Sequence, residues 1–409
     1  MGKLSQKYNR YDIYIFLLIV SLVFGGFGGA LMVVRVLAII LLPALISKMR
    51  YCKDYVNSYG KFFVIFYIFC LMSMLWTPDK SQGFKELLYY PVHFVVFLEI
   101  LVFSRFANKP LNTISTGWLI SAGITLVIAI WEITTSNHLA LSKFEADDIT
   151  LNVGGVISNR PFAAVTFGNF NGYVAYLCFA MPFIFYYLLQ NGKDIKKVVI
   201  SMAVFFAAIV TILVDASRGG LLSLLTMGVI FVFNTKRSIY KTGLILSVVL
   251  LVIYYIIPQM DTLFAAMSIK AEGSNLYSDE SRFHIWADGL KVLYNTAFIG
   301  SGVGSISAAM RKVTTGITIT HNMFLEILVQ FGVVFFFAFM MYLLRLFMKT
   351  RRLNIKNVKT MIYMALISLP IYAIIDSGYL LNPAVYVAFA GLTVFAYINR
   401  INPQSLKEK

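Results

Sequence analysis

The sequence predicts an all-α integral membrane protein with about twelve transmembrane helices. Three observations support this fold class: the composition, the long apolar runs and the placement of the basic residues. Of the 409 residues, 59% are hydrophobic and 13% are charged, whereas a soluble globular domain is about 45–50% apolar and about 25% charged. We therefore expect residues 1–409 to form a single polytopic membrane domain.

Apolar runs long enough to cross a bilayer recur along the whole chain, since a transmembrane helix needs about 20 mostly apolar residues. The twelve predicted spans are residues 12–30, 31–48, 61–78, 86–104, 111–133, 166–190, 197–214, 218–235, 241–258, 322–347, 360–376 and 380–399. The first run lacks a convincing small-residue cleavage site, which favours a first helix over a cleaved signal peptide.

The basic residues predict the orientation of the spans. When the spans alternate, most of the 35 Lys and Arg residues fall in the segments on one side of the membrane, which is the cytoplasmic side by the positive-inside rule. Both termini are then cytoplasmic, and Arg35 is ambiguous. The same bias explains the net charge of +16 better than nucleic-acid binding does.

Two predicted outer loops are long, and long loops in a compact chain are usually functional. The first covers residues 134–165, and the larger, residues 259–320, lies between spans nine and ten. Within it, the spacing of Phe283, Trp286, Leu290 and Leu293 predicts an amphipathic helix over 282–294 that packs on the membrane face. With no soluble catalytic domain apparent, any chemistry would belong to the bundle and these loops.

Two arginines lie at or near the predicted outer face. Arg218 follows Asp215, Ala216 and Ser217 and precedes two glycines at the start of a span, where free N–H groups and the helix dipole favour an anion. An interfacial anchor paired with Asp215 is the alternative. Arg282 lies in the large loop, where an ordinary solvated side chain is the alternative.

Three further polar groups lie at the outer ends of spans. His321 precedes Asn322 at the mouth of span ten and could act as a general base, or it could simply be hydrogen-bonded at a helix cap. Glu326 and Asp376 are costly within or beside a span unless they are paired.

The sequence predicts neither a metal nor a cofactor. Cys52, Cys70 and Cys178 form no CxxC pair and are expected to be small core residues, and no His or Cys spacing suits a metal. The glycine-rich stretch at 300–304 is weak evidence for phosphate binding because no Rossmann strand precedes it.

Several segments together resemble the O-antigen ligase and polysaccharide polymerase family of bacterial membrane proteins. These are residues 217–222 with Arg218, Arg282 with Trp286 in a large outer loop, and His321-Asn322 with Gly332 ten residues after Asn322. Residues 168–172, which include Asn171, and residues 76–78 also look like segments of that family. The resemblance covers most of the chain.

The resemblance implies a metal-independent glycosyltransferase of the bacterial cytoplasmic (inner) membrane, with its active site facing the periplasm or exterior. The donor would be an undecaprenyl-diphosphate-linked glycan. A ligase passes the glycan to lipid A-core in lipopolysaccharide biosynthesis, and a polymerase passes it to another lipid-linked repeat unit, as in capsule or exopolysaccharide biosynthesis. Direct attack by the acceptor would invert the anomeric centre.

The resemblance also assigns roles to residues of this chain. Arg218 and Arg282 would hold the diphosphate, and His321 would serve the acceptor hydroxyl. The expected supporting residues are Asn322, Glu326, Asp376, Asp215, Asn171 and Trp286.

Two other function classes remain open. One is a transporter or flippase of lipid-linked oligosaccharide, although transporters tend to place broken helices and charges near the midplane. The other is a non-catalytic scaffold for envelope-assembly partners. Ligase and polymerase, the sugar and the oligomeric state are left open by the sequence.

Overall fold

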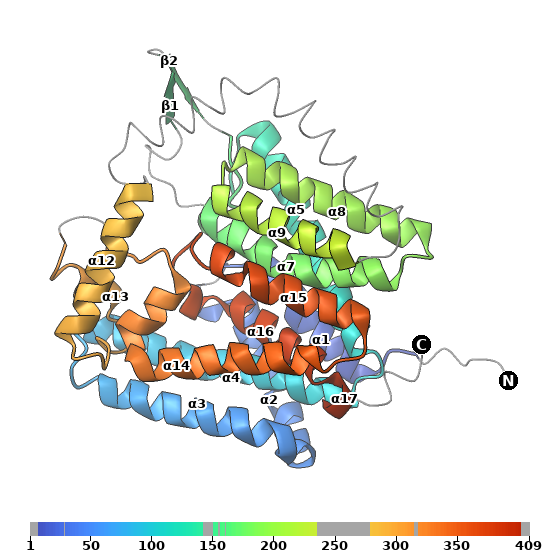
Figure 1. Cartoon of the computed structure of the whole chain (residues 1–409), viewed down its shortest axis with the longest axis horizontal. Coiled ribbons are helices and arrows are strands. Elements are labelled where there is room, and N and C mark those ends of the chain that lie inside the picture. Colours follow the sequence, from blue (N-terminus) through green and yellow to red (C-terminus); the bar gives the residue numbers. More distant parts are fainter. Residues whose placement is uncertain are drawn as a thin grey trace.

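The computed structural model describes residues 7–27, 29–141, 150–153, 156–159, 161–234, 279–314 and 318–401. In these ranges the chain forms a bundle of helices that run largely side by side (Figure 1). The N-terminal elements are α1 (Arg10–Val20), η1 (Ser21–Phe24), η2 (Gly29–Leu31), α2 (Val33–Met49), η3 (Arg50–Cys52), α3 (Lys53–Ser73), α4 (Lys80–Phe106) and α5 (Pro110–Thr135). The central elements are β1 (Thr150–Val153), β2 (Val156–Asn159), α7 (Phe170–Gln190), α8 (Ile195–Val214) and α9 (Arg218–Asn234). The C-terminal elements are α12 (Asp279–Asn295), α13 (Ile306–Met310), α14 (Met323–Arg351), α15 (Lys356–Tyr372), η6 (Tyr379–Leu381), α16 (Pro383–Ala396) and α17 (Ile398–Ile401).

The helices have the length and apolarity of a multi-pass membrane protein. Six described helices, namely α3, α4, α5, α7, α8 and α14, are long and apolar enough to cross a bilayer, and α9 and α16 are shorter apolar helices. All the predicted spans except 241–258 coincide with helical segments, and 241–258 lies outside the described residues. The total of twelve spans and their orientation stay predictions.

Part of the first predicted long loop is not helical. Strands β1 and β2 form an antiparallel hairpin in which Thr150 pairs with Asn159 and Val153 with Val156. All the other described elements are helical, so the all-α fold class is confirmed apart from this hairpin, which stands at the end of the bundle that also carries α12 (Figure 1).

The first predicted span, 12–30, is too long. Helix α1 ends at Val20 and the following 3-10 turn ends at Phe24, because Gly25 adopts a left-handed φ of 44°. A Cβ at Gly25 would lie 2.4 Å from the carbonyl oxygen of Thr166. The chain turns here because it packs closely against the segment that precedes α7.

Helix α7 lies at the centre of the bundle and packs against α5, α8, α9 and α15. In lipid the hydrophobic effect does not drive helices together, so their association depends on close van der Waals packing. The indole of Trp118 stacks on Phe183 with ring centroids 5.5 Å apart. A Cβ at Gly220 would lie 2.6 Å from Val174 Cγ1, so the glycine lets α9 approach α7.

Arg35, which the basic-residue pattern left ambiguous, is buried near the start of α2. Its Nε donates to His93 Nε2 at 3.2 Å, and its guanidinium carbon lies 3.9 Å from the ring centroid of Tyr89. Carbonyl oxygens of Gly29, Ala30 and Leu381 accept its other hydrogen bonds. The arginine therefore ties α2 to α4 and to the turn before α16.

Helix α12 forms where the sequence predicts an amphipathic helix, but the residues that pack differ in part. Ile285 and Val292 are buried against α14, at Leu325 among others, whereas Phe283 and Leu290 are exposed. The helix has two apolar stripes, one with Ile285 and Val292 and one with Phe283 and Leu290. Helical periodicity alone does not say which of the two faces the rest of the protein.

Candidate active site

Helix α12 joins two segments that are distant in sequence. Arg282 Nη1 donates to the carbonyl oxygen of Ile374 at 3.1 Å. One turn further along, Trp286 Nε1 donates to the carbonyl oxygen of Thr320, also at 3.1 Å. The two carbonyls belong to the turn before α14 and the turn after α15, so α12 holds both turns at one place.

His321 lies in the turn before α14, next to the residue that Trp286 binds. Its backbone has a left-handed φ of 44°, which is uncommon for a residue other than glycine and often marks a functional site. Both ring nitrogens are buried, and neither has a hydrogen-bond partner among the described residues. The imidazole therefore keeps two hydrogen-bonding positions that no described residue uses.

Burial and, to a lesser extent, the nearby positive charge of Arg282 together lower the pKa of His321 from 6.5 to about 4. The ring is consequently neutral at neutral pH. A neutral imidazole can accept a proton, as a general base must. The electrostatic interaction also shows that Arg282 and His321 share one environment.

The residues after His321 form the start of α14. The Asn322 side-chain oxygen caps the helix by accepting hydrogen bonds from the N–H groups of Phe324 and Leu325, at 3.0 and 3.2 Å. Glu326 is buried in the first turn, and its Oε1 accepts a hydrogen bond from the Gly378 N–H at 2.5 Å. These two predicted supporting residues therefore shape the backbone around His321.

Asp376 approaches the same region from the turn after α15. It is buried, and its Oδ1 has no hydrogen-bond partner among the described residues. A Cβ at Gly172 would lie 3.0 Å from Asp376 Oδ2 and 3.2 Å from Asn169 Oδ1. The start of α7 thus borders Asp376 through Gly172 and Asn169, while the predicted Asn171 is half-buried in the first turn of α7.

Arg218 is the first residue of α9 and is exposed. The next residue, Gly219, lies so close to the turn after α15 that a Cβ on it would be 3.0 Å from Ile375 Cγ1. Arg282 binds Ile374, the neighbour of Ile375. The Arg282 side chain and the backbone next to Arg218 therefore border the same short segment, residues 374–376, from two separate helices.

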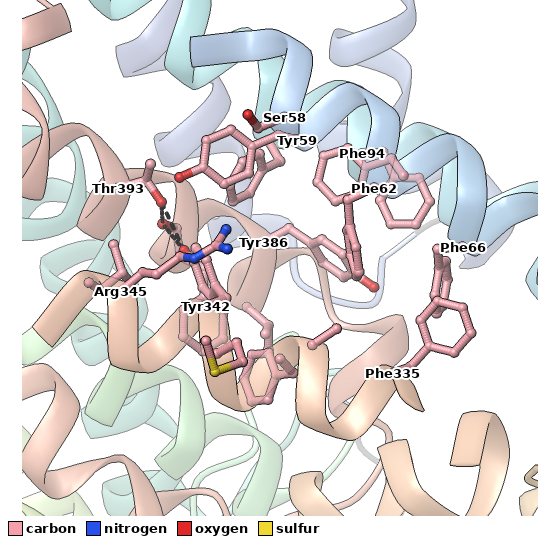
Figure 2. Close-up of a pocket in the computed structure, with 18 of the residues that line it drawn as sticks. Ser58, Tyr59, Phe62, Phe66, Phe94, Phe335, Tyr342, Arg345, Tyr386 and Thr393 are labelled. Carbon is pink, nitrogen blue, oxygen red and sulfur yellow. Dashed lines mark hydrogen bonds between the residues drawn. The ribbon is translucent and has the colours of Figure 1, made fainter. Parts of the chain in front are cut away.

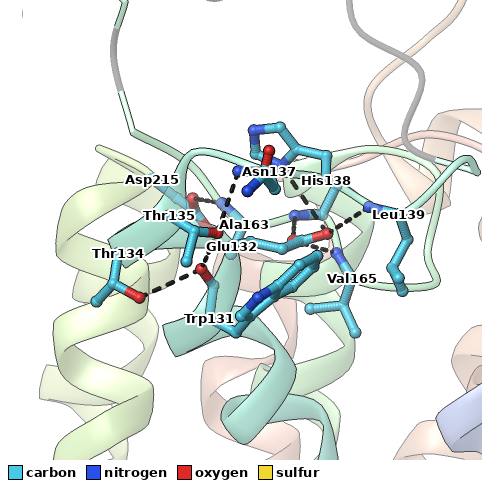
Figure 3. A network of polar contacts seen from close by, with 11 residues as sticks. Trp131, Glu132, Thr134, Thr135, Asn137, His138, Leu139, Ala163, Val165 and Asp215 are labelled. Atoms are coloured by element: carbon cyan, nitrogen blue, oxygen red, sulfur yellow. Dashed lines mark hydrogen bonds and ion pairs between the residues drawn. The ribbon is translucent and has the colours of Figure 1, made fainter.

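Two buried carboxylates fix the strand-like segment before α7 (Figure 3). Asp215 Oδ1 accepts a hydrogen bond from the Ala163 N–H at 2.8 Å. Glu132 Oε2 accepts hydrogen bonds from the N–H groups of Ala164 and Val165, at 2.9 and 2.8 Å. Asp215 thereby positions backbone near Arg218.

Sequence reasoning missed Glu132, although a signal was present. It is a carboxylate near the end of an apolar span, and such a group is costly unless it is bonded. Asn169 was missed as well, since its neighbour Asn171 offered the same side-chain chemistry. Which of the two lies beside Asp376 depends on where α7 begins, and α7 begins with Asn169 as its cap.

The glycine-rich stretch at 300–304 has a structural role. The N–H groups of Ser301 and Gly302 donate to the carbonyl oxygens of Val329 and Gln330 in α14. The N–H group of Val303 donates to Ser73 Oγ in α3, and the N–H group of Gly304 donates to Glu86 Oε2 in α4. Four successive donors are already used, so this turn does not cradle a phosphate.

Two residues of the 76–78 segment bind the same turn. Trp76 Nε1 donates to the Gly300 carbonyl oxygen at 3.0 Å, and Thr77 Oγ1 donates to that of Val303 at 2.7 Å. Opposite them, Gly332 has a φ of 75° within α14, and a Cβ there would lie 2.3 Å from the Ile299 carbonyl oxygen. These parts of the family resemblance therefore support the site without lining it.

Across the part of the chain that the structure describes, no group of three or more His, Cys, Asp or Glu residues is placed to hold a metal ion. The three cysteines are buried, as expected of small core residues. In the described residues, the candidate site comprises Arg282, His321, Glu326 and Asp376, and Arg218 begins α9 beside the same turn.

Two comparisons with known proteins bear on the family of the chain. Residues 203–340 match the family model described as O-Antigen ligase, and this region contains Arg218, Arg282 and His321. The chain is also similar to the teichuronic acid biosynthesis protein TuaE of Bacillus subtilis (strain 168), with 21% identity over 284 residues. That alignment covers 66% of this chain and 56% of the length of TuaE. Together with the motifs, these matches support the resemblance to the O-antigen ligase and polysaccharide polymerase family.

Proposed function

We propose that this protein is an inverting glycosyltransferase that moves a glycan from undecaprenyl diphosphate to a hydroxyl acceptor at the outer face of the cytoplasmic membrane. The observation that carries the proposal is the pairing of His321 with Arg282. A buried, neutral imidazole with two unused nitrogens lies within the electrostatic reach of a cation. Glycosyl transfer from a diphosphate needs this combination, a proton acceptor beside a group that attracts an anion.

The arginines suit a diphosphate leaving group. The Arg282 side chain binds residue 374 and the backbone beside Arg218 borders residue 375, so we expect a pair of phosphates to contact both arginines. Each charge-assisted hydrogen bond to a phosphate oxygen contributes about 1.5–3 kcal/mol. Because negative charge grows on the leaving oxygen during the reaction, these bonds strengthen in the transition state.

His321 would act on the acceptor. The acceptor oxygen attacks the anomeric carbon, its proton passes to a ring nitrogen of His321, and the bond from carbon to the phosphate oxygen breaks, which releases the lipid diphosphate. A pKa of about 4 makes the empty site a weak base. The negative charge of a bound diphosphate would offset Arg282 and raise that pKa towards neutrality, where a general base works best.

The test uses purified protein in lipid nanodiscs with a lipid-linked glycan and a hydroxyl acceptor. His321→Ala should lower turnover by about 10²–10⁴-fold, the usual contribution of a general base, and Arg282→Ala and Arg218→Ala should weaken donor use. His284→Ala and Arg311→Ala are matched controls, since both side chains are exposed and lie outside the cluster. Full activity in all three site variants would overturn the site.

The choice of acceptor follows from the same assay. Transfer to lipid A-core would identify a ligase, and growth of the lipid-linked glycan by repeat units would identify a polymerase. If labelled donor instead crosses the membrane of proteoliposomes and no glycan is transferred, the transporter alternative replaces the glycosyltransferase. The scaffold alternative predicts that the site variants alter the capture of partner proteins and leave turnover unaffected.

A further inference from the structure

A separate cavity of about 450 Å³ lies between α3, α4, α14 and α16. Its volume is within the roughly 300–1,000 Å³ typical of ligand sites. Aromatic rings from all four helices line it, with Phe62 and Phe66 on α3, Phe94 on α4, Phe335 on α14 and Tyr386 on α16 (Figure 2). The walls are therefore apolar over most of the length, and we refer to this cavity as the aromatic groove.

One end of the aromatic groove is polar and cationic. Arg345 and Arg400 both line it, and both are close enough to Tyr397 to interact with it electrostatically. The Tyr342 hydroxyl lies 2.8 Å from Thr393 Oγ1 at the same end, and Figure 2 shows the Arg345 guanidinium beside these groups. No Asp or Glu is among the described residues that line the groove, so the charge at this end is uncompensated within its walls.

The opposite end lies beneath the candidate active site. Ile327 and Leu380 line it, and they are the neighbours of Glu326 and close to Gly378. From Ile327 to Arg345 the α14 wall rises through 18 residue steps, or up to about 27 Å at 1.5 Å per step, since Gly332 interrupts the helical backbone. That length is close to the roughly 30 Å hydrocarbon thickness of a bilayer, so the groove runs along the depth of the membrane with its cationic end away from His321.

We propose that the aromatic groove binds an anionic phospholipid, with the phosphate at Arg345 and Arg400 and an acyl chain along the aromatic wall. Guanidinium groups bind phosphate oxygens through paired hydrogen bonds. By the positive-inside bias this end faces the cytoplasmic leaflet, where anionic lipids attract basic residues. The inference concerns a lipid that is not a substrate, and it does not depend on glycosyl transfer.

The test is retention of lipid by the full-length protein. The chain is reconstituted in nanodiscs with equal amounts of phosphatidylglycerol and phosphatidylcholine and extracted in detergent, and the bound lipids are measured by native mass spectrometry. Wild type should retain phosphatidylglycerol over phosphatidylcholine by about tenfold, because both lipids have a phosphate but the quaternary ammonium of phosphatidylcholine is repelled by the two guanidinium groups. The double variant Arg345→Gln/Arg400→Gln should lose this preference.

The matched control is Arg351→Gln/Arg352→Gln, which removes the same number of charges from the same end of α14 outside the groove lining. It should retain the preference for phosphatidylglycerol. Because a charge variant could fold poorly, Ala338→Phe provides a second probe. Ala338 lines the groove, so a phenyl ring there should reduce retention of both phospholipids, and Ala338→Ser should not.

Equal retention of the two phospholipids by wild type would overturn the proposal, as would an unchanged preference in the Arg345/Arg400 variant. Retention of polyprenyl phosphate in place of phospholipid, in nanodiscs that contain both, would assign the groove to the donor chain and also overturn it. None of these outcomes involves glycan transfer, so they are distinguishable from a failure of the proposed function.

Discussion

Replacing Arg282 by Gln should raise the pKa of His321. Burial and the charge of Arg282 together lower this pKa from 6.5 to about 4, and burial is the larger cause. Removing the charge should therefore restore less than half of the decrease, which places the pKa of the variant at about 5. The chain has four histidines, so a titration of isotope-labelled imidazoles by NMR can resolve His321, with the spectrum of His321→Ala for assignment.

Two control variants separate charge from geometry. Arg282→Lys keeps a positive charge, and Trp286→Phe removes the hydrogen bond to the Thr320 carbonyl oxygen without changing any charge. Both should leave the pKa of His321 near 4. A wild-type His321 that titrates at 6.5 or above, or an unchanged pKa in Arg282→Gln, would refute the reasoning.

The same pKa determines how His321 affects stability. The folded chain binds this proton less tightly than the unfolded chain, whose histidine keeps a pKa near 6.5. The contribution of His321 therefore favours the fold above pH 6.5 and is lost as the pH falls from 6.5 to about 4. In Arg282→Gln this pH window should be narrower, and thermal unfolding at several pH values would measure it.

Three further changes test the framework of the site. Glu132→Ala should lower the thermal midpoint in detergent, because two buried N–H groups lose their acceptor at about 1–3 kcal/mol each, and Glu132→Gln should lower it less. Gly332→Ala should also be destabilising by about 1–3 kcal/mol or more, since its Cβ would collide with backbone, whereas Gly60→Ala, with open space at its Cβ, should be neutral or slightly stabilising. Gly172→Ala should reduce turnover more than stability, since its Cβ would be 3.0 Å from Asp376 Oδ2; an unchanged turnover would separate Asp376 from the reaction.

The sequence predicts much of the helical framework because a membrane span can be recognised from the length and apolarity of its run of residues. The sequence also predicts that His321 and Arg282 lie on the same side, since both stand at outer ends of predicted elements. Contacts between helices are harder to predict from the sequence. Whether Asn169 or Asn171 borders Asp376, and whether Phe283 or Ile285 of α12 is buried, depends on how each helix is rotated about its axis.

Among the sequence patterns, a short glycine-rich stretch is the weakest guide to function. The stretch at 300–304 has the composition of a flexible anion-binding turn, yet its N–H groups bond to α3, α4 and α14. Local sequence carries no information on these partners, because Ser73 and Glu86 are more than 200 residues away along the chain. The hydrogen bonds of Glu132 to residues 164 and 165 illustrate the same limit.

Because hydrogen bonds fix the turn at 300–304, a small rotation of α12 about its C-terminal end would move its N-terminal end by a much larger distance. Helix α12 ends at Asn295, and residues 296–299 connect it to this turn, while Arg282 lies 13 residues before Asn295, or about 20 Å along the helix axis. A rotation of about 5° about the fixed end would displace Arg282 by about 2 Å, and misplacement by about 1 Å can cost a catalytic site about 10²-fold. The hydrogen bonds of Arg282 and Trp286 to the turns beside His321 therefore limit an angular error that the length of α12 would otherwise magnify.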